Sequence, residues 1–189
     1  MKDIIKLGLI LFTFCVLAAS ALMLTDQVTA APIQKQIDQA NELARKGVFP
    51  EADSFEPLAA ADLDELKADF KILQEVYYAK KGSDIIGYVV KTTPSGFSGA
   101  IEITTGISVD AKLTGVRVGS MTETPGLGDL AKKPDFYEQY TGKSTGAEIG
   151  VNKSTPGENE IQALTGATIT SRAVTLGVNT AVQVVEFIK

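Results

Sequence analysis

The sequence contains no histidine and a single cysteine, Cys15. Without histidine there is no imidazole proton shuttle, and the chain has too few thiolate and imidazole ligands for a zinc site or a cysteine-ligated cluster. One cysteine also excludes a disulfide within the chain. We therefore expect no metal and no catalytic residues, and any electron transfer by this protein must use a bound cofactor.

Positive charge is also scarce. The chain has 18 basic and 23 acidic residues, a net charge of −5, and the first 30 residues hold two of each kind. The remainder therefore keeps the same excess of acid, which argues against nucleic acid as a partner because nucleic acid attracts basic patches. With 44% hydrophobic and 22% charged residues, the composition favours a folded domain over disorder.

Residues 7–24 form a long run without any charge. As a helix these 18 residues would reach about 27 Å, close to the thickness of a bilayer's hydrocarbon core. Lys2 and Lys6 precede the run, which predicts a single-pass anchor in the lipid of the cytoplasmic membrane with a cytoplasmic N-terminus. The alternative is a signal peptide cleaved before Ala31. In both cases the rest of the chain is expected outside the cytoplasm, in the periplasm or its equivalent.

The remaining chain is expected to have two parts after the anchor of residues 1–30. Residues 31–56 predict an amphipathic linker helix and then a turn-rich loop, with Phe49 and Phe55 in the core. Residues 57–189 would form one domain of ordinary size.

Within that domain the pattern changes from helical to strand-like after residue 70. β-Branched and aromatic residues form short runs separated by turn signals such as 80–84. Consecutive strands with short connections favour an antiparallel sheet with flanking helices, and hence the α+β class. Residues 62–69 predict a short helix, residues 136–140 a helix with aromatics in the core or at its rim, and residues 141–160 a surface loop. The expected strands span residues 71–79, 85–92, 100–105 and 113–118.

Near the C-terminus, the run from Thr165 to Ser171 reads Thr-Gly-Ala-Thr-Ile-Thr-Ser. It precedes apolar residues at helical spacing, so the hydroxyls should lie where a helix begins. Unpaired N–H groups and the positive dipole end favour hydroxyl caps and anions there. Gly166 and Ala167 leave the Thr168 hydroxyl open to close approach. An ordinary capped helix has the same pattern. The apolar positions are Val174, Val178, Ala181, Val182, Val185 and Ile188.

A second motif, Glu-Thr-Pro-Gly-Leu-Gly, spans residues 123–128. Its Pro-Gly pair fixes a tight turn, and Gly128 allows the backbone to approach a flat ligand or a neighbouring strand. A purely structural loop is the alternative interpretation.

Together these runs resemble the FMN-binding domain family, shared by the G-type component of the Rnf electron-transport complex and the C-type component of the sodium-pumping NADH:quinone oxidoreductase. Phe97-Ser98-Gly99 is similar to an aromatic-x-Gly segment of that family. The resemblance implies FMN joined by a phosphoester to Thr168, made from FAD by a separate flavin transferase. It also implies cofactor contacts from Glu123, Thr124, Gly126, Leu127, Thr165, Gly166, Ala167, Thr170 and Ser171.

The implied function is electron transfer through covalent FMN between membrane subunits of an ion-translocating ferredoxin:NAD⁺ oxidoreductase, without turnover by the chain alone. Two positions depart from the family pattern: Met121 replaces a frequent histidine, and Gln162 replaces a frequent aspartate. Two alternatives remain. One is another FMN-domain electron carrier, such as the C-type component of a quinone oxidoreductase. The other is a membrane-tethered scaffold without cofactor, in which Thr168 only caps a helix.

Overall fold

The computed structural model of the chain describes residues 2–189. Contacts divide the chain into two compact units, the first ending at Glu42 and the second spanning Leu43–Lys189. The described part of the first unit lies within one helix, α1 (Lys2–Val48), and the last residues of that helix belong to the second unit. The two units are described separately below.

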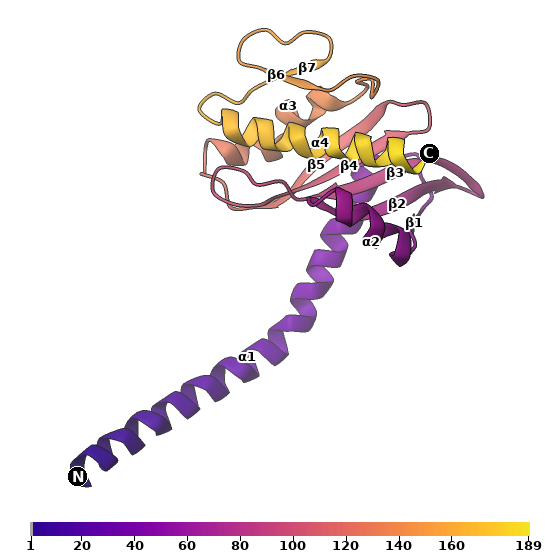
Figure 1. The fold of residues 1–189 in the computed structure, drawn as a ribbon. Coiled ribbons are helices and arrows are strands. Elements are labelled where there is room, and N and C mark those ends of the chain that lie inside the picture. The colour runs from indigo at the N-terminus through magenta and orange to yellow at the C-terminus, as the bar shows by residue number, and fades with distance from the viewer. Residues whose placement is uncertain (1) are drawn as a thin grey trace. The chain divides into compact units, whose positions relative to one another are not determined.

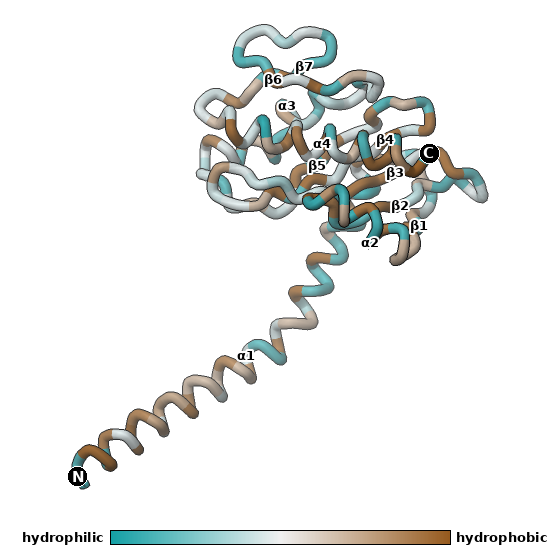
Figure 2. Tube along the Cα trace, viewed as in Figure 1, coloured by the Kyte–Doolittle hydropathy of each residue, from teal (hydrophilic) through white to brown (hydrophobic). Residues whose placement is uncertain are grey.

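Helix α1 is hydrophobic through its first half and more hydrophilic toward its end (Figure 2). It is long and apolar enough to cross a membrane, and none of its most apolar window is buried within the protein. The helix continues through Pro32, so the anchor and the linker helix, expected as separate segments, form one helix. The large apolar side chains that α1 exposes suit a lipid solvent rather than water.

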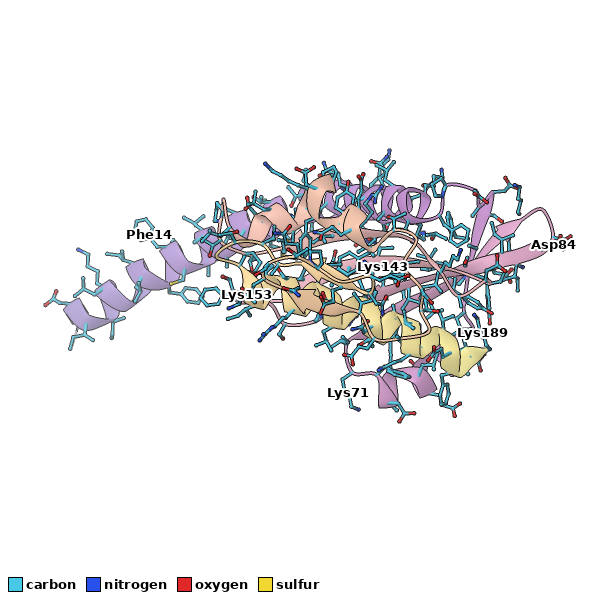
Figure 3. The ribbon with its side chains drawn as sticks, turned by 90° about the horizontal axis from the view of Figure 1, so that it is seen from above. Phe14, Lys71, Asp84, Lys143, Lys153 and Lys189 are labelled. Atoms are coloured by element: carbon cyan, nitrogen blue, oxygen red, sulfur yellow. The ribbon has the colours of Figure 1, made fainter. Side chains whose placement is uncertain are left out.

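The second unit is built on a five-stranded antiparallel sheet (Figure 1) whose order follows the sequence. The four strands expected from residues 71–118 are confirmed, as is the α+β class. The turn between β2 and β3, with Asp84, projects at one end of the unit (Figure 3). The strands are β1 (Ser54–Pro57), β2 (Leu73–Lys81), β3 (Asp84–Thr92), β4 (Ile101–Ser108) and β5 (Leu113–Met121).

Two expected loops contain strands that the sequence pattern missed. β1 lies in the segment expected as a loop and pairs with β2, placing Ser54 opposite Lys80. The segment 141–160, also expected as loop, contains β6, which pairs in parallel with β7. Each of these strands has three or four residues, too few for a periodic pattern to emerge. The strands are β6 (Gly150–Asn152) and β7 (Glu160–Gln162).

Short helices connect the strands, and one long helix closes the fold. Phe136 and Tyr140, in the connection after β5, are buried as expected, and burial raises the pKa of the Tyr140 phenol. The Tyr140 hydroxyl lies 2.7 Å from the hydroxyl of Thr175 on the long helix. The helices are α2 (Ala60–Asp69), η1 (Gly128–Lys132), α3 (Pro134–Tyr137), η2 (Glu138–Tyr140) and α4 (Thr168–Ile188).

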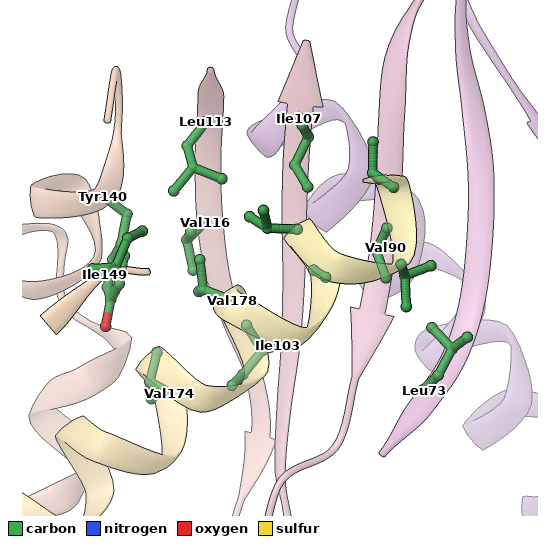
Figure 4. Packing of buried hydrophobic residues seen from close by; sticks show 14 of the residues in the cluster. Leu73, Val90, Ile103, Ile107, Leu113, Val116, Tyr140, Ile149, Val174 and Val178 are labelled. Atoms are coloured by element: carbon green, nitrogen blue, oxygen red, sulfur yellow. The ribbon is translucent and has the colours of Figure 1, made fainter. Parts of the chain in front are cut away.

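Helix α4 lies across one face of the sheet (Figure 4). Its apolar stripe is buried, as its spacing predicts: Val174 and Val178 are fully buried and pack in the same cluster as Ile103 of β4 and Val90 of β3. At 21 residues, the helix is about 31 Å long. Burial of this stripe supplies the main apolar contact between helix and sheet.

The opposite face of the sheet holds the end of α1. Val48 and Phe49 are buried there with Val89, the strand neighbour of Val90, so the side-chain alternation of β3 serves both faces. The Val48 carbonyl accepts a hydrogen bond from Thr114 Oγ1 at 2.6 Å. Residues 43–56 therefore belong to the folded unit, whereas the expected linker extended to residue 56; the reason is this burial, which a thin apolar stripe did not indicate.

Gly106 provides the close approach. A Cβ atom added there would lie 2.6 Å from the Val48 carbonyl oxygen and would also meet Thr114 Oγ1. Alanine normally stabilises a strand relative to glycine, by roughly 0.5–1 kcal/mol, but here the methyl group has no space. We expect Gly106→Ala to destabilise the full chain by about 1–3 kcal/mol, measured by urea denaturation in detergent micelles followed by circular dichroism.

The matched control is Gly146→Ala, whose added Cβ would have Ser144 Oγ at 3.5 Å as its neighbour. It should leave the denaturation midpoint nearly unchanged. Equal midpoints for the two variants would contradict the close approach of Val48 to the sheet.

Candidate functional site

A pocket of about 360 Å³ lies where three segments distant in sequence converge. One is the turn between β3 and β4, the second is the loop after β5, and the third is the first turn of α4 with the residues before it. The pocket brings together seven of the ten residues predicted for the site and adds three others. Its lining consists of Phe97, Glu123, Thr124, Leu127, Gly128, Gly166, Ala167, Thr168, Ile169 and Thr170.

The helix begins at Thr168, within the hydroxyl-rich run, but not with the expected cap. Ala167 occupies the N-cap position, and no side chain caps the helix. The first backbone hydrogen bond runs from the Ser171 N–H to the Ala167 carbonyl at 3.0 Å. The N–H groups of the preceding turn therefore have no intrahelical acceptor. Together with the positive end of the helix dipole, they form a place for an anion at the pocket wall.

The hydroxyl groups of the run have separate roles in the structure. Ser171 Oγ donates to the Ala167 carbonyl and accepts from the Leu164 N–H, both at 3.0 Å, which ties the chain before α4 to the helix. Thr170 Oγ1 donates to Glu123. The hydroxyl of half-buried Thr168 has no hydrogen-bond partner within residues 2–189. It lines the pocket and remains available to a ligand.

Glu123 joins the three segments. Its side chain is only 7% exposed. One carboxylate oxygen accepts from Thr170 Oγ1 at 2.6 Å, and the other accepts from the Ser98 N–H at 2.9 Å. The short distance to the hydroxyl is typical of a charge-assisted hydrogen bond. The carboxylate thus links the loop after β5 to α4 and to the β3–β4 turn.

Gly166 and Leu127 shape the pocket wall between these anchors. Gly166 has a φ of +78°, a left-handed conformation that strains residues with a Cβ atom. An added Cβ would also lie 3.1 Å from Leu127 Cδ2. Both constraints explain why the residue two positions before Thr168 is glycine.

Three predicted site residues lie outside the pocket. Gly126, with a φ of +74°, forms the turn that the Pro-Gly pair predicts. Ser171 is fully buried in the scaffold behind the pocket. Thr165 lines a neighbouring cavity of about 450 Å³, together with Gln162 and Gln139. The two departures from the family pattern also lie outside: Gln162 borders that second cavity, and Met121 packs against the core.

The structure adds Phe97, Gly128 and Ile169 to the predicted set. Phe97 and Ile169 are 68% and 55% exposed, so the pocket has an apolar rim open to solvent. Phe97 was visible as part of the aromatic-x-Gly segment, and Gly128 as the last residue of the second motif. Ile169 carried no signal, because an apolar residue in a helix is expected to face the core.

Comparisons with known proteins agree with this placement. A family model described as "FMN-binding domain" matches residues 96–183, a range that includes every residue lining the pocket. A second, described as "RnfG N-terminal region", matches residues 1–44.

The chain is similar over nearly its whole length to G-type components of membrane complexes. That of the Na⁺-translocating ferredoxin:NAD⁺ oxidoreductase complex of Acetobacterium woodii is 45% identical, over 97% of this chain and 92% of that protein. That of the proton-translocating complex of Clostridium ljungdahlii is 36% identical over 89% and 82%. That of an ion-translocating oxidoreductase complex of Methanosarcina acetivorans is 32% identical over 97% and 95%.

Among solved structures, the C-type component of the Na⁺-translocating NADH-quinone reductase of Parabacteroides distasonis has a TM-score of 0.55 and 25% identity. The match covers 70% of this chain and 71% of that one. It supports the α+β fold described above.

The Thr170–Glu123 hydrogen bond should be measurable as stability. Thr170→Val keeps the shape of the side chain but leaves a buried carboxylate oxygen without its donor. We expect a loss of about 1–3 kcal/mol in the free energy of unfolding, measured by urea denaturation of the full chain in micelles.

Thr168→Val is the matched control two residues earlier, where the hydroxyl has no partner within the described chain. It should change the free energy of unfolding by less than about 0.5 kcal/mol. A loss as small for Thr170→Val would show that the bond to Glu123 does not hold the site together.

Proposed function

Because the chain belongs to the family of G-type components of ion-translocating oxidoreductase complexes, we propose that it is the electron-transfer component of a ferredoxin:NAD⁺ oxidoreductase complex and carries covalent FMN on Thr168. The observation that carries this proposal is the unpartnered Thr168 hydroxyl, placed in a pocket at the start of α4. The chain alone would relay electrons without turnover of its own.

The pocket is suited to a flavin. Its volume of about 360 Å³ lies in the range of small-molecule and cofactor sites. Leu127 and Phe97 offer apolar surface to a flat ring, and both are partly exposed where no protein atoms cover them. When bound, FMN supplies reversible electron transfer, which this chain's own side chains do not. Residues 57–189 contain all of this surface, and we assign FMN binding to them.

The start of α4 suits the phosphate end of the cofactor. The N–H groups of its first turn lack intrahelical acceptors, and the helix dipole is positive there. A phosphate ester on Thr168 would be stabilised by both. Formation of that ester joins Thr168 Oγ1 to the FMN phosphorus of FAD, breaks the diphosphate bond, and releases AMP with the hydroxyl proton.

The chain does not supply the base for this step. A threonine hydroxyl is a weak nucleophile without an adjacent base, and the nearest carboxylate in the pocket, Glu123, is occupied by Thr170 and Ser98. A separate flavin transferase would therefore provide the catalysis. Exposed Gly166 and buried Ala167 leave the hydroxyl accessible to such an enzyme.

Membrane placement follows from α1. Its first half would span the bilayer, with Lys2 and Lys6 holding the N-terminus in the cytoplasm and the FMN-binding part outside it. The other membrane subunits of the complex would be its electron-transfer partners, and lipid would surround the anchor. A covalent bond prevents loss of the cofactor into a dilute external space.

Two other functions are disfavoured. The C-type component of a quinone oxidoreductase is disfavoured by length, because this chain covers 71% of the solved C-type protein but 92% of the Acetobacterium woodii G-type protein. A scaffold without cofactor would need Thr168 as a helix cap, yet the N-cap position belongs to Ala167.

Intact mass of the purified full chain, co-expressed with an extracytoplasmic flavin transferase, tests the proposal. The wild-type protein should gain a mass equal to FMN less water. Thr168→Val should lose that gain completely, because valine has no oxygen to esterify.

Thr165→Val is the matched control and should retain the flavin, because Thr165 lines the neighbouring cavity. Flavin retained in Thr168→Val would move the acceptor to another hydroxyl, Thr170 or Thr165. An unmodified wild-type chain would favour the scaffold function.

A further inference from the structure

The pocket contains one formal charge. Of the described residues that line it, Glu123 is the one with an ionisable side chain, and the others are apolar, small or hydroxyl-bearing. No lysine or arginine is among these lining residues. A ligand in the pocket would therefore face a buried negative charge.

The carboxylate is held in a fixed position. Thr170 Oγ1 and the Ser98 N–H each bind one oxygen, at 2.6 and 2.9 Å. Glycines stand on both sides: an added Cβ at Gly128 would lie 2.7 Å from one carboxylate oxygen, and one at Gly96 would collide with the other. These contacts leave Glu123 little freedom to turn away from the pocket.

The charge is not compensated by an ion pair. The salt bridges found in the described chain join Lys80 to Glu56 and Lys91 to Glu102, and neither includes Glu123. Its compensation comes from two hydrogen bonds and from the positive end of α4, where Thr170 is the third residue. Arg172, the nearest basic residue along α4, is exposed.

The fold alone does not require this charge. A buried unpaired carboxylate loses hydration and is costly. A glutamine of the same shape could accept the Ser98 N–H with its oxygen and donate to Thr170 with its amide, at lower desolvation cost. The charge itself therefore points to a role in the pocket.

We propose that Glu123 is a positioning residue that also sets the electrostatics of the flavin site, lowering the reduction potential of the bound flavin. The proposal rests on the FMN function above. Adding an electron to the flavin adds negative charge beside a fixed negative charge, and their repulsion is stronger in a pocket of low dielectric than in water. The protein thus disfavours the reduced flavin and favours passing electrons on.

The test is the midpoint potential of the covalent flavin in the full-length protein in detergent, measured by spectroelectrochemistry at pH 8. Glu123→Gln removes the charge and keeps the shape. It should make the potential more positive, by about a tenfold change in the equilibrium for adding one electron, which is 59 mV. An unchanged or more negative potential would overturn the proposal.

Two further variants separate charge from packing. Thr170→Val removes the donor to the carboxylate but keeps the charge, so its potential should equal or lie below the wild-type value. Glu102→Gln neutralises a carboxylate paired with Lys91 outside the pocket and should leave the potential unchanged. A positive shift in either variant equal to that of Glu123→Gln would overturn the charge effect.

The flavin content of the preparations distinguishes the two proposals. A wild-type chain that accepts no flavin overturns the proposed function, and the charge effect with it. A loaded wild-type chain with no positive shift in Glu123→Gln overturns the charge effect alone. If Glu123→Gln accepts no flavin, Thr170→Val decides: a potential above the wild-type value overturns the proposal.

Discussion

The burial of α4 across the antiparallel sheet is the contact on which the rest of the structure depends. Val174, Val178 and Val185 place the helix against β3 and β4. A helix is a stiff rod, so burying its later turns also fixes the position of its first turn. That turn meets the loop after β5, and the pocket forms at the meeting point. The reactive end of the helix is therefore positioned by apolar contacts far from the chemistry.

At that end, the hydroxyl groups divide the work. Ser171 secures the chain before the helix, and Thr170 binds Glu123. Because these side chains do not cap the helix, its first N–H groups and the Thr168 hydroxyl stay available. An acceptor oxygen and an anion site thus lie side by side, which is the combination that a phosphoester-linked cofactor needs.

The other face of the sheet serves the link to the membrane segment. Gly106 and Thr114 receive the backbone of Val48, and Phe49 is buried beside it. The chain that leaves the apolar part of α1 is therefore held by the folded unit before its first strand begins. This contact uses the face that α4 leaves free, so cofactor site and membrane connection do not compete for the same surface.

Local pattern in the sequence was sufficient for the elements with strong periodicity: the apolar half of α1, the hairpins of β2–β5 and the buried stripe of α4. It also marked both motifs, because Gly126 and Gly166 meet backbone requirements that are set locally. Only the tertiary structure decided which hydroxyl remains free, since that depends on Glu123, 47 residues before Thr170. The short strands and the rim residue Ile169 likewise arise from contacts between distant segments, which no local pattern records.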